Sequence, residues 1–247
     1  LALLDTFKKA GTIAQELRKK GLIKKFKNDN TPVTNADIEV NNILSKKISQ
    51  LTPEIPIVSE ETSENKEEKN LKNFWLVDPI DGTHDFVNNK EEFTLNAALI
   101  INKEPVIGII NAPDKKRLFY SYGLSNSFEL SRGEEIKLID KKKENKNLIT
   151  AVSYSNELKP EISKLHKKFK INKYQKMKSS LKFCVIAASE FDLYVAEARA
   201  CEWDIAAGHA ILEHAGGSLT DFNEKKILYG KPGFKNPSLI LKGKHIL

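Results

Sequence analysis

Two aspartates at the end of an apolar run have the spacing of a divalent metal site. Asp78 and Asp81 follow the run 74–77, a proline stands between them, and Gly82 and Thr83 come next. The proline stiffens the bend and the glycine permits a close approach of the backbone, so both carboxylates can face one point. If Gly82 and Thr83 open a helix, its free N–H groups form an anion site beside the metals. Hard cations beside an anion site indicate phosphoryl chemistry.

Two further acids extend this set of possible ligands. Glu60 follows the short apolar run 55–59, and Asp204 stands at the predicted N-terminus of a helix. Together with Asp78 and Asp81 they would supply oxygen ligands for two or three Mg²⁺ ions, with water and a substrate phosphate completing the coordination. For each acid taken alone, the alternative is a solvated strand end or, for Asp204, a helix N-cap.

The order and spacing of these motifs resemble one family. Residues 59–61, 75–83 and 202–208, with the glycine pair 216–217 behind them, are similar to the signatures of the inositol monophosphatase superfamily. Periodicity alone supports only a mixture of helices and strands. The resemblance implies an α/β (α+β) fold, a layered α/β/α/β/α sandwich like that of fructose-bisphosphatase, and a homodimer as a possible assembly.

Within this superfamily, the segments 93–100 and 179–184 resemble the 3'(2'),5'-bisphosphate nucleotidase branch. The resemblance spans nearly the whole chain, from residues 32–37 to residues 236–238. It implies a Mg²⁺-dependent phosphatase that converts adenosine 3',5'-bisphosphate to AMP and phosphate, clears a by-product of sulfate activation and is inhibited by lithium.

Three departures from that branch bear on the substrate. The chain has the segment 153–156 where the branch has arginine and histidine, Lys178 where it has glycine, and Ala196 where it has arginine. The last change matters most, because a planar guanidinium suits a second phosphate. An inositol or sugar monophosphatase is therefore the main alternative. A noncatalytic nucleotide-binding protein is a remote alternative, which the presence of all the metal-ligating acids disfavours.

The resemblance also implies two metal sites that share a carboxylate. The expected ligands are Glu60, Asp78, the Ile80 carbonyl, Asp81 and Asp204. Asp78 would bridge the two ions. Thr83 would accept a proton from the attacking water and pass its own hydroxyl hydrogen to Asp37. The alternative for Thr83 and Asp37 is ordinary polarity in the first turn of a helix.

The resemblance implies further contacts to the substrate and to a third metal. Glu61 would assist catalysis by steering a third metal or a water. The expected substrate-binding residues are Glu60, Ile80, Asp81, Gly82, Thr83, Ser179, Lys182, Glu197 and Asp204. Ser179 and Lys182 match positions that contact a nucleotide, whereas Glu197 matches one that recognises a sugar hydroxyl. For His84 we expect a position at the surface or behind the residues that contact the substrate; the alternative is a contact to phosphate.

Composition places few other limits on function. The chain has 247 residues, 40% of them hydrophobic, and a net charge of +7, but its lysines are scattered among polar residues. We expect a small phosphorylated substrate and no nucleic acid polymer as partner. Cys184 and Cys201 have neither a metal nor a redox spacing, which favours two structural thiols in a cytoplasmic protein. Asp5 interrupts the apolar start of the chain, so we expect no membrane insertion.

Hydrophobic periodicity and turn residues predict the elements that position these groups. The predicted helices are 1–20, 37–51 (entered through Thr34), 157–169, 180–190 and 205–215, and the predicted strands are 94–101, 106–110, 118–122, 148–153 and 191–196. The first three strands read as an antiparallel meander. Residues 64–72 read as a mobile loop, a short helix or a plain connector. The polar stretch 140–147 predicts a boundary between an N-terminal subdomain (1–143), which carries most metal ligands, and a C-terminal subdomain (144–247), which supplies Asp204 and substrate contacts.

Overall fold

The computed structural model describes residues 2–26, 31–62, 64–68, 71–143, 145 and 147–246. Over these residues the helices are α1 (Leu4–Lys20), α2 (Asn35–Leu51), α3 (Thr83–Val87), α4 (Pro160–Lys168), α5 (Leu181–Ala187) and α6 (Glu202–His214). The strands are β1 (Lys24–Phe26), β2 (Pro32–Thr34), β3 (Ile57–Ser59), β4 (Phe74–Asp81), β5 (Thr94–Ile101), β6 (Glu104–Ala112), β7 (Arg117–Ser121), β8 (Ser127–Ser131), β9 (Glu134–Lys137), β10 (Thr150–Ser153), β11 (Lys173–Lys176), β12 (Leu193–Ala196), β13 (Ser218–Asp221) and β14 (Leu239–Lys242). Short 3₁₀ turns lie at Pro113–Lys115, Leu138–Asp140 and Pro232–Phe234.

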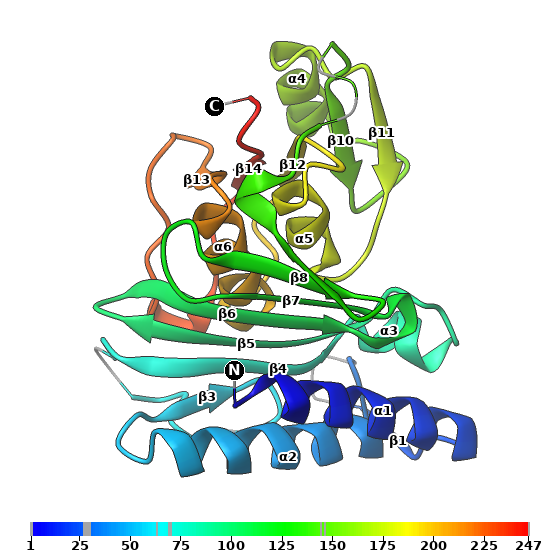
Figure 1. Ribbon diagram of the computed structural model, residues 1–247, viewed down its shortest axis with the longest axis vertical. Coiled ribbons are helices and arrows are strands. Elements are labelled where there is room, and N and C mark those ends of the chain that lie inside the picture. Colours follow the sequence, from blue (N-terminus) through cyan, green and yellow to red (C-terminus); the bar gives the residue numbers. More distant parts are fainter. Residues whose placement is uncertain are drawn as a thin grey trace.

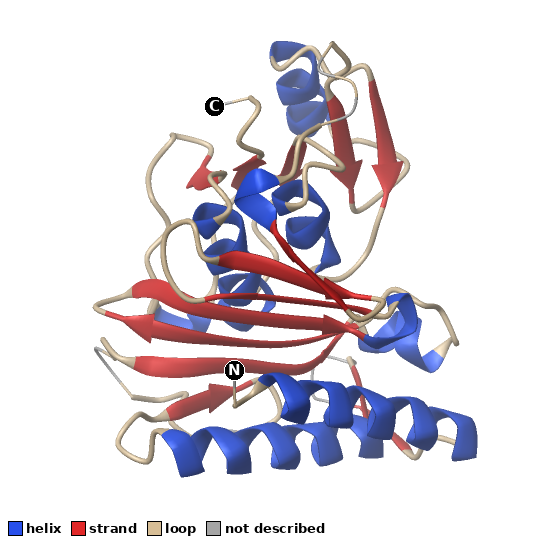
Figure 2. Ribbon diagram, viewed as in Figure 1, coloured by secondary structure: helices blue, strands red, loops and turns tan. Residues whose placement is uncertain are grey.

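Two larger sheets alternate with three layers of helix (Figures 1 and 2). Helices α1 and α2 cover one face of the sheet β3–β9, and α5 and α6 lie between this sheet and the sheet β10–β14. Helix α4 packs on the outer face of the second sheet through Ile162 and Leu165. The predicted α/β/α/β/α sandwich is therefore confirmed.

The seven-stranded sheet has the order β3-β4-β5-β6-β7-β8-β9. Its first pair, β3 and β4, is parallel, and every later pair is antiparallel, which confirms the predicted meander. The pairing of β4 with β5 shifts register between Asp78 and Asp81. A bulge re-aims side chains at the end of a strand, and Pro79 within it supplies the bend that the sequence predicts.

The five-stranded sheet has the order β11-β10-β12-β14-β13. Strands β11, β10 and β12 are mutually parallel, whereas β14 runs antiparallel to both β12 and β13. The carboxyl ends of three parallel strands therefore meet at one edge of this sheet. Such an edge is where open α/β sheets place their ligands.

Helix α2 begins as its sequence predicts. Thr34 is the N-cap and its hydroxyl oxygen accepts the backbone N–H groups of Ala36 and Asp37, while the Asp37 carboxylate accepts the Thr34 N–H at 2.8 Å. This reciprocal capping box satisfies donors that the first turn leaves free. It also fixes the Asp37 side chain, because the carboxylate accepts the Thr34 hydroxyl at 2.6 Å as well.

Helix α6 lies against β6 at a distance that only glycine permits. A Cβ atom on Gly108 would stand 2.3 Å from the carbonyl oxygen of Ala207. Without that atom, the helix that carries Asp204 packs directly on the sheet that carries Asp78. Close helix–sheet packing therefore sets the spacing between two of the predicted metal ligands.

The passage from one sheet to the other falls in the segment after Leu138–Asp140, where the polar stretch is located. Residues 144 and 146 of that stretch lie outside the described residues. One hydrophobic core contains Leu76 of β4, Ile211 of α6 and Leu241 of β14, so it spans both sheets. The division into subdomains at residues 143 and 144 stays a prediction.

In the connector 64–72, residues 64–67 form a turn, and residues 69 and 70 lie outside the described part of the chain. A helix in this stretch is not seen among the residues that are described. Within the described ranges, no helix has the length and apolar character needed to cross a membrane.

Candidate active site

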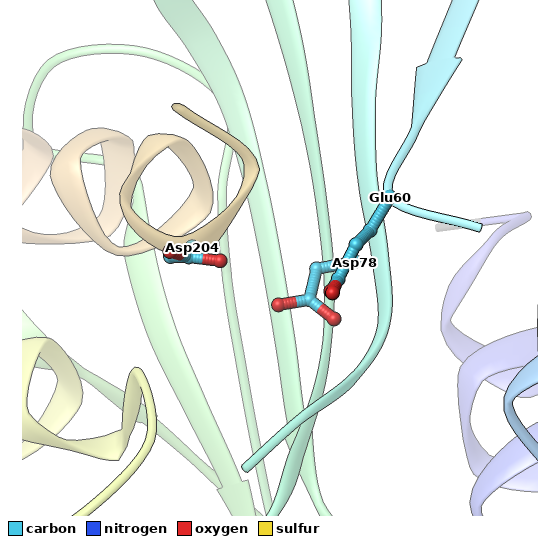
Figure 3. Close-up of side chains that lie close together, drawn as sticks. All are labelled: Glu60, Asp78 and Asp204. Atoms are coloured by element: carbon cyan, nitrogen blue, oxygen red, sulfur yellow. The ribbon is translucent and has the colours of Figure 1, made fainter. Parts of the chain in front are cut away.

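Three carboxylates from three elements converge at the junction of the first sheet with α6. Glu60 directly follows β3, Asp78 lies within β4 and Asp204 lies in the first turn of α6 (Figure 3). One oxygen from each lies within 4.8 Å of the others. Strands β3 and β4 are parallel and the Glu60 N–H donates to the Val77 carbonyl at 3.0 Å, which holds the two strand ends together.

Asp78 is the deepest of the three acids. Asp78 is 1% exposed, and neither of its carboxylate oxygens has a hydrogen-bond donor among the described residues. Burial raises the pKa of Asp78 well above its ordinary value, and the charges of Glu60 and Asp81 raise it further. Burying an unpaired charge is costly unless a counter-charge is present. The residues therefore fit hard divalent cations, which take carboxylate oxygens as ligands.

Asp81 and Asp204 stand on either side of the same opening. One Asp81 oxygen accepts the Ser180 N–H, and burial raises its pKa while the Lys182 charge opposes that rise. Asp204 accepts the Cys201 N–H at 2.7 Å. Burial, followed by the charges of Asp81 and Glu60, raises the pKa of Asp204 to about 8. A raised pKa means that the ionised carboxylates are unfavourable here without a counter-charge, which a bound cation would supply.

The structure brings Thr83 and Asp37 together. The Thr83 hydroxyl lies 3.3 Å from Asp37 Oδ1 and 2.9 Å from the Ile80 carbonyl oxygen. Asp37 is fully buried, and burial raises its pKa. The hydroxyl hydrogen thus has two acceptors within reach, Asp37 and the nearer Ile80 carbonyl, and a hydroxyl that donates to either retains lone pairs that can accept a hydrogen bond. The Ile80 carbonyl stays a predicted backbone ligand.

A cavity of about 190 Å³ adjoins the acidic cluster. It is lined by Asp81 and Asp204, and Gly82 lies beside them with φ +89°, a left-handed conformation that favours glycine. Tyr154, Lys178 and Arg199 also line it. Acidic and basic side chains therefore line one cavity, which suits an anionic molecule bound beside cations.

Three of the cavity residues lie at the edge where three parallel strands finish. Tyr154 follows β10, Lys178 follows β11 and Arg199 follows β12. The Lys178 Nζ atom lies 3.1 Å from the centre of the Tyr154 ring, and the Arg199 Cζ atom lies 3.4 Å from it. The pKa of Tyr154 is lowered, chiefly by Lys178. Sequence reasoning missed Tyr154 and Arg199, and their position just after predicted strands is the signal that could have found them.

Residues 2–245 match the Inositol monophosphatase family. The chain belongs to this family. It is 38% identical over 205 residues to the 3'(2'),5'-bisphosphate nucleotidase CysQ of Buchnera aphidicola, which covers 83% of this chain and 76% of that protein. It is 30% identical over 243 residues to the CysQ of Aggregatibacter actinomycetemcomitans, with 97% and 90% covered. The crystal structure of CysQ from Bacteroides thetaiotaomicron superimposes with a TM-score of 0.79 at 29% identity, covering 98% of this chain and 96% of the other.

In this inositol monophosphatase family member, Lys182 lies deep in the cavity. The residue is 5% exposed, and its Nζ donates to the Ser179 carbonyl. Burial lowers the pKa of Lys182 to about 8, although the charge of Asp81 opposes this. Ser179 is also buried and has a left-handed φ of +52°. Both predicted nucleotide contacts therefore line the cavity.

Ser180 is a site residue that sequence reasoning did not single out. Its N–H holds Asp81, and its hydroxyl lies 2.8 Å from both Thr94 Oγ1 and Asn96 Oδ1. These contacts tie the loop before α5 to strand β5. The loop before α5 is thereby fixed against strands β4 and β5 of the first sheet.

Other predicted site residues lie apart from the acidic cluster. The Glu61 N–H donates to Ser59 Oγ at 3.3 Å, and among the described acids Glu61 is not part of the close group. Glu197 forms an ion pair with Lys159 and is not among the described residues that line the cavity. The His84 side chain lines the cavity at its rim and is 77% exposed, in line with the surface position expected.

The two cysteines are free thiols, with Cys184 buried and Cys201 half-buried. Burial raises the pKa of both thiols. This is consistent with the structural role predicted for them. Cys201 is the residue before α6, and its contact to the site is the backbone N–H that Asp204 accepts.

Proposed function

We propose that this chain is a Mg²⁺-dependent phosphomonoesterase that hydrolyses adenosine 3',5'-bisphosphate to AMP and phosphate. The observation that carries the proposal is the buried Asp78 carboxylate, grouped with Glu60 and Asp204 beside a cavity that contains both acidic and basic side chains. The relatives from Buchnera aphidicola and Aggregatibacter actinomycetemcomitans, both 3'(2'),5'-bisphosphate nucleotidases at 38% and 30% identity, support the same activity.

We assign the roles of the residues from their positions. Glu60, Asp78 and the Ile80 carbonyl would hold one Mg²⁺, and Asp78, Asp81 and Asp204 a second, with Asp78 shared. When bound, the ions lower the pKa of the attacking water and stabilise charge on the leaving oxygen. Thr83 would orient that water, with its hydroxyl hydrogen passed to Asp37, which lies 3.3 Å from the hydroxyl oxygen.

The remaining parts of the proposal concern the cellular setting. Two or three ions would act in turnover, and lithium would inhibit by replacing Mg²⁺ at the weaker site. The substrate would be a small phosphorylated molecule, a by-product of sulfate activation, handled in the cytoplasm. A homodimer is part of this proposal because the family resemblance implies it.

The structure weighs against the polyol alternative in one respect. Glu197, the residue expected to accept sugar hydroxyls, is already paired with Lys159. Glu197 is also not among the described residues that line the cavity, so its carboxylate would have to turn toward the substrate to bind a sugar hydroxyl. We therefore favour the nucleotide.

A phosphate-release assay tests the proposal. The purified protein is given adenosine 3',5'-bisphosphate, inositol 1-phosphate and fructose 1,6-bisphosphate, each with Mg²⁺ and with a chelator. We expect release from the nucleotide to be fastest, to require Mg²⁺ and to fall on addition of Li⁺. Faster release from inositol 1-phosphate would establish the alternative, and equal release with the chelator would exclude the metal mechanism.

A further inference from the structure

Two cations at the mouth of the cavity are held against one aromatic ring. Lys178 and Arg199 lie 3.1 and 3.4 Å from the centre of the Tyr154 ring. Two groups so close to one centre would clash on the same face, so they occupy opposite faces. Tyr154 is 39% exposed, which places the three residues at the solvent end of the cavity. We refer to Tyr154, Lys178 and Arg199 as the cation clamp.

We propose that the cation clamp binds the phosphate group of the substrate that is not hydrolysed. This assignment rests on the proposed function, because it requires a substrate with two phosphates. It makes Arg199 and Lys178 the specificity-determining residues. They supply from new positions the positive charge that the family resemblance expects at position 196, where Ala196 lines the same cavity.

The first support is the lack of acidic partners. Many cations of this chain are paired, as Lys90 is with Asp85 and Lys231 with Glu202. Among the described residues, neither Lys178 nor Arg199 has a carboxylate within 4.0 Å. Both remain available to an anion. The ring contacts hold them in place beforehand, which lowers the entropic cost of binding.

The second support concerns what the clamp excludes. Single-stranded nucleotides and bases are often bound by stacking on an aromatic face. Both faces of Tyr154 are occupied by cations, so the ring offers no platform for a base. What the clamp presents is two positive charges, and a guanidinium in particular binds phosphate through paired N–H donors.

The third support is the position of the other cation in the cavity. Lys182 is buried, its Nζ donates to the Ser179 carbonyl, and its charge acts on Asp81. Its ammonium group is therefore already engaged within the protein. The charge of Arg199 also acts on Asp81 and Asp204, but Arg199 and Lys178 lie against the partly exposed Tyr154 ring at the edge where β10, β11 and β12 finish, where a phosphate can reach them.

The test compares two substrates that differ only in the second phosphate: adenosine 3',5'-bisphosphate and adenosine 3'-monophosphate. For Arg199→Ala and Lys178→Ala, we expect the ratio of kcat/KM for the first over the second to fall roughly tenfold, mainly through KM. Lys46→Ala, an exposed lysine of α2, serves as the matched control and should keep the ratio. Calorimetric binding of 5'-AMP, which carries the second phosphate alone, should weaken by a similar factor.

Two further variants separate binding from folding. Tyr154→Phe keeps the ring and should keep the ratio, whereas Tyr154→Ala should lower it. Ala196→Arg added to Arg199→Ala should restore part of it. An unchanged ratio and unchanged 5'-AMP binding in Arg199→Ala would overturn the clamp while leaving the nucleotidase activity standing. If the wild-type protein does not hydrolyse the bisphosphate, the proposed function fails and the clamp assignment fails with it.

Discussion

Asp78 is buried without a hydrogen-bond donor in the described part of the chain. This burial destabilises the folded apo protein, and it also favours the binding of a cation to the carboxylate. In most buried carboxylates, donors share the charge and lower the demand for a counter-ion. Here Glu60 and Asp204 add negative charge to the same space. The free energy that the apo protein loses at this site is the driving force available for binding a metal.

Asp78→Asn should therefore have opposite effects on activity and stability. We expect turnover to fall by at least about 10²-fold, because the site acts electrostatically. In metal-free buffer the free energy of unfolding should rise by roughly 1–3 kcal/mol, because a buried charge has been removed. Mg²⁺ should no longer raise the melting temperature. The matched control is Glu39→Gln, an exposed acid of α2, and a variant Asp78→Asn that still turns over like wild type would remove Asp78 from the ligand set.

Thr83 has a different role from the acids, and its substitution should separate the two. Thr83→Val keeps the shape and loses the hydroxyl between Asp37 and the cavity. We expect kcat to fall by roughly 10²-fold, the usual contribution of a positioned proton-transfer group. The Mg²⁺ concentration for half-maximal activity should stay unchanged. Thr83→Ser retains the hydroxyl and should recover most of the rate; equal losses in both variants would contradict the role of the hydroxyl.

The acids could be predicted from the sequence, whereas the cation clamp could not. Asp78 and Asp81 end an apolar run, which is a local pattern visible in a few residues. Tyr154, Lys178 and Arg199 are separated by more than twenty residues from one to the next and meet only because β10, β11 and β12 are parallel. The residues next to each of them in the sequence do not indicate which strands pair. The expectation based on Ala196 alone therefore underestimated the positive charge in the cavity.

At the scale of elements, α6 lies between the two sheets and carries the proposed metal ligand Asp204 in its first turn. Its Glu202 carboxylate is fully buried and accepts the N–H groups of Gly230 at 2.8 Å and Lys231 at 3.0 Å. This anchors the start of the helix to a distant loop. Gly108 of β6 lets the middle of the helix approach the sheet. Two independent contacts thus set the position of Asp204.

Gly108→Ala should move α6 and so weaken metal binding. The added methyl group would meet the Ala207 carbonyl, a backbone atom that can give way only if the helix shifts. Overpacking of this kind costs about 1–3 kcal/mol of stability. We expect a several-fold higher Mg²⁺ requirement for activity in addition to the lower melting temperature.

Ile109→Ala provides the control for Gly108→Ala. Ile109 lies on the same strand, 4% exposed, and packs in the core with α1 and α2 on the other face of the sheet. Its truncation should cost roughly 2–5 kcal/mol while leaving α6 in place. An equal change of Mg²⁺ requirement in both variants would show that lost stability alone, and not the position of α6, explains the effect.

The sequence predicts the helices more accurately than it predicts strand β11. Helices α1 and α2 lie within three residues of their predicted bounds, because apolar periodicity and the Thr34 cap define them. The predicted helix 157–169 begins later, at Pro160, since proline favours the first turn. Strand β11 has four exposed polar or aromatic residues and no alternating apolar face, so no hydrophobic pattern predicts it. Its place was fixed only by pairing with β10.

At the scale of the whole molecule, the cluster of carboxylates is negative, whereas the chain as a whole has a net charge of +7. A basic surface attracts anionic substrates over long range, and the local cluster of carboxylates retains cations. The five-layer arrangement came from the family resemblance, because composition and periodicity restrict the fold only to mixed α and β. The core that spans both sheets is a property of the complete chain.

The same cluster should make the stability of the whole molecule depend jointly on pH and Mg²⁺. The pKa of Asp204 is raised to about 8 from its ordinary 3.8, and those of Asp78 and Asp81 are raised as well. Over that interval the folded apo protein binds more protons than the unfolded chain. Its free energy of unfolding therefore falls as the pH rises toward 8.

Mg²⁺ takes the place of those protons, so its effect should grow as the pH rises. We expect the increase in melting temperature caused by Mg²⁺ to be small near about pH 5 and several-fold larger near about pH 8, because at low pH protons compete for the same oxygens. Thermal melts with Mg²⁺ and with a chelator, at matched ionic strength, measure this difference. Asp204→Asn removes the group with the most clearly displaced pKa and should flatten the dependence, whereas Glu39→Gln should preserve it. An increase in melting temperature that is constant from acid to alkaline pH would mean that Mg²⁺ does not bind where these carboxylates converge.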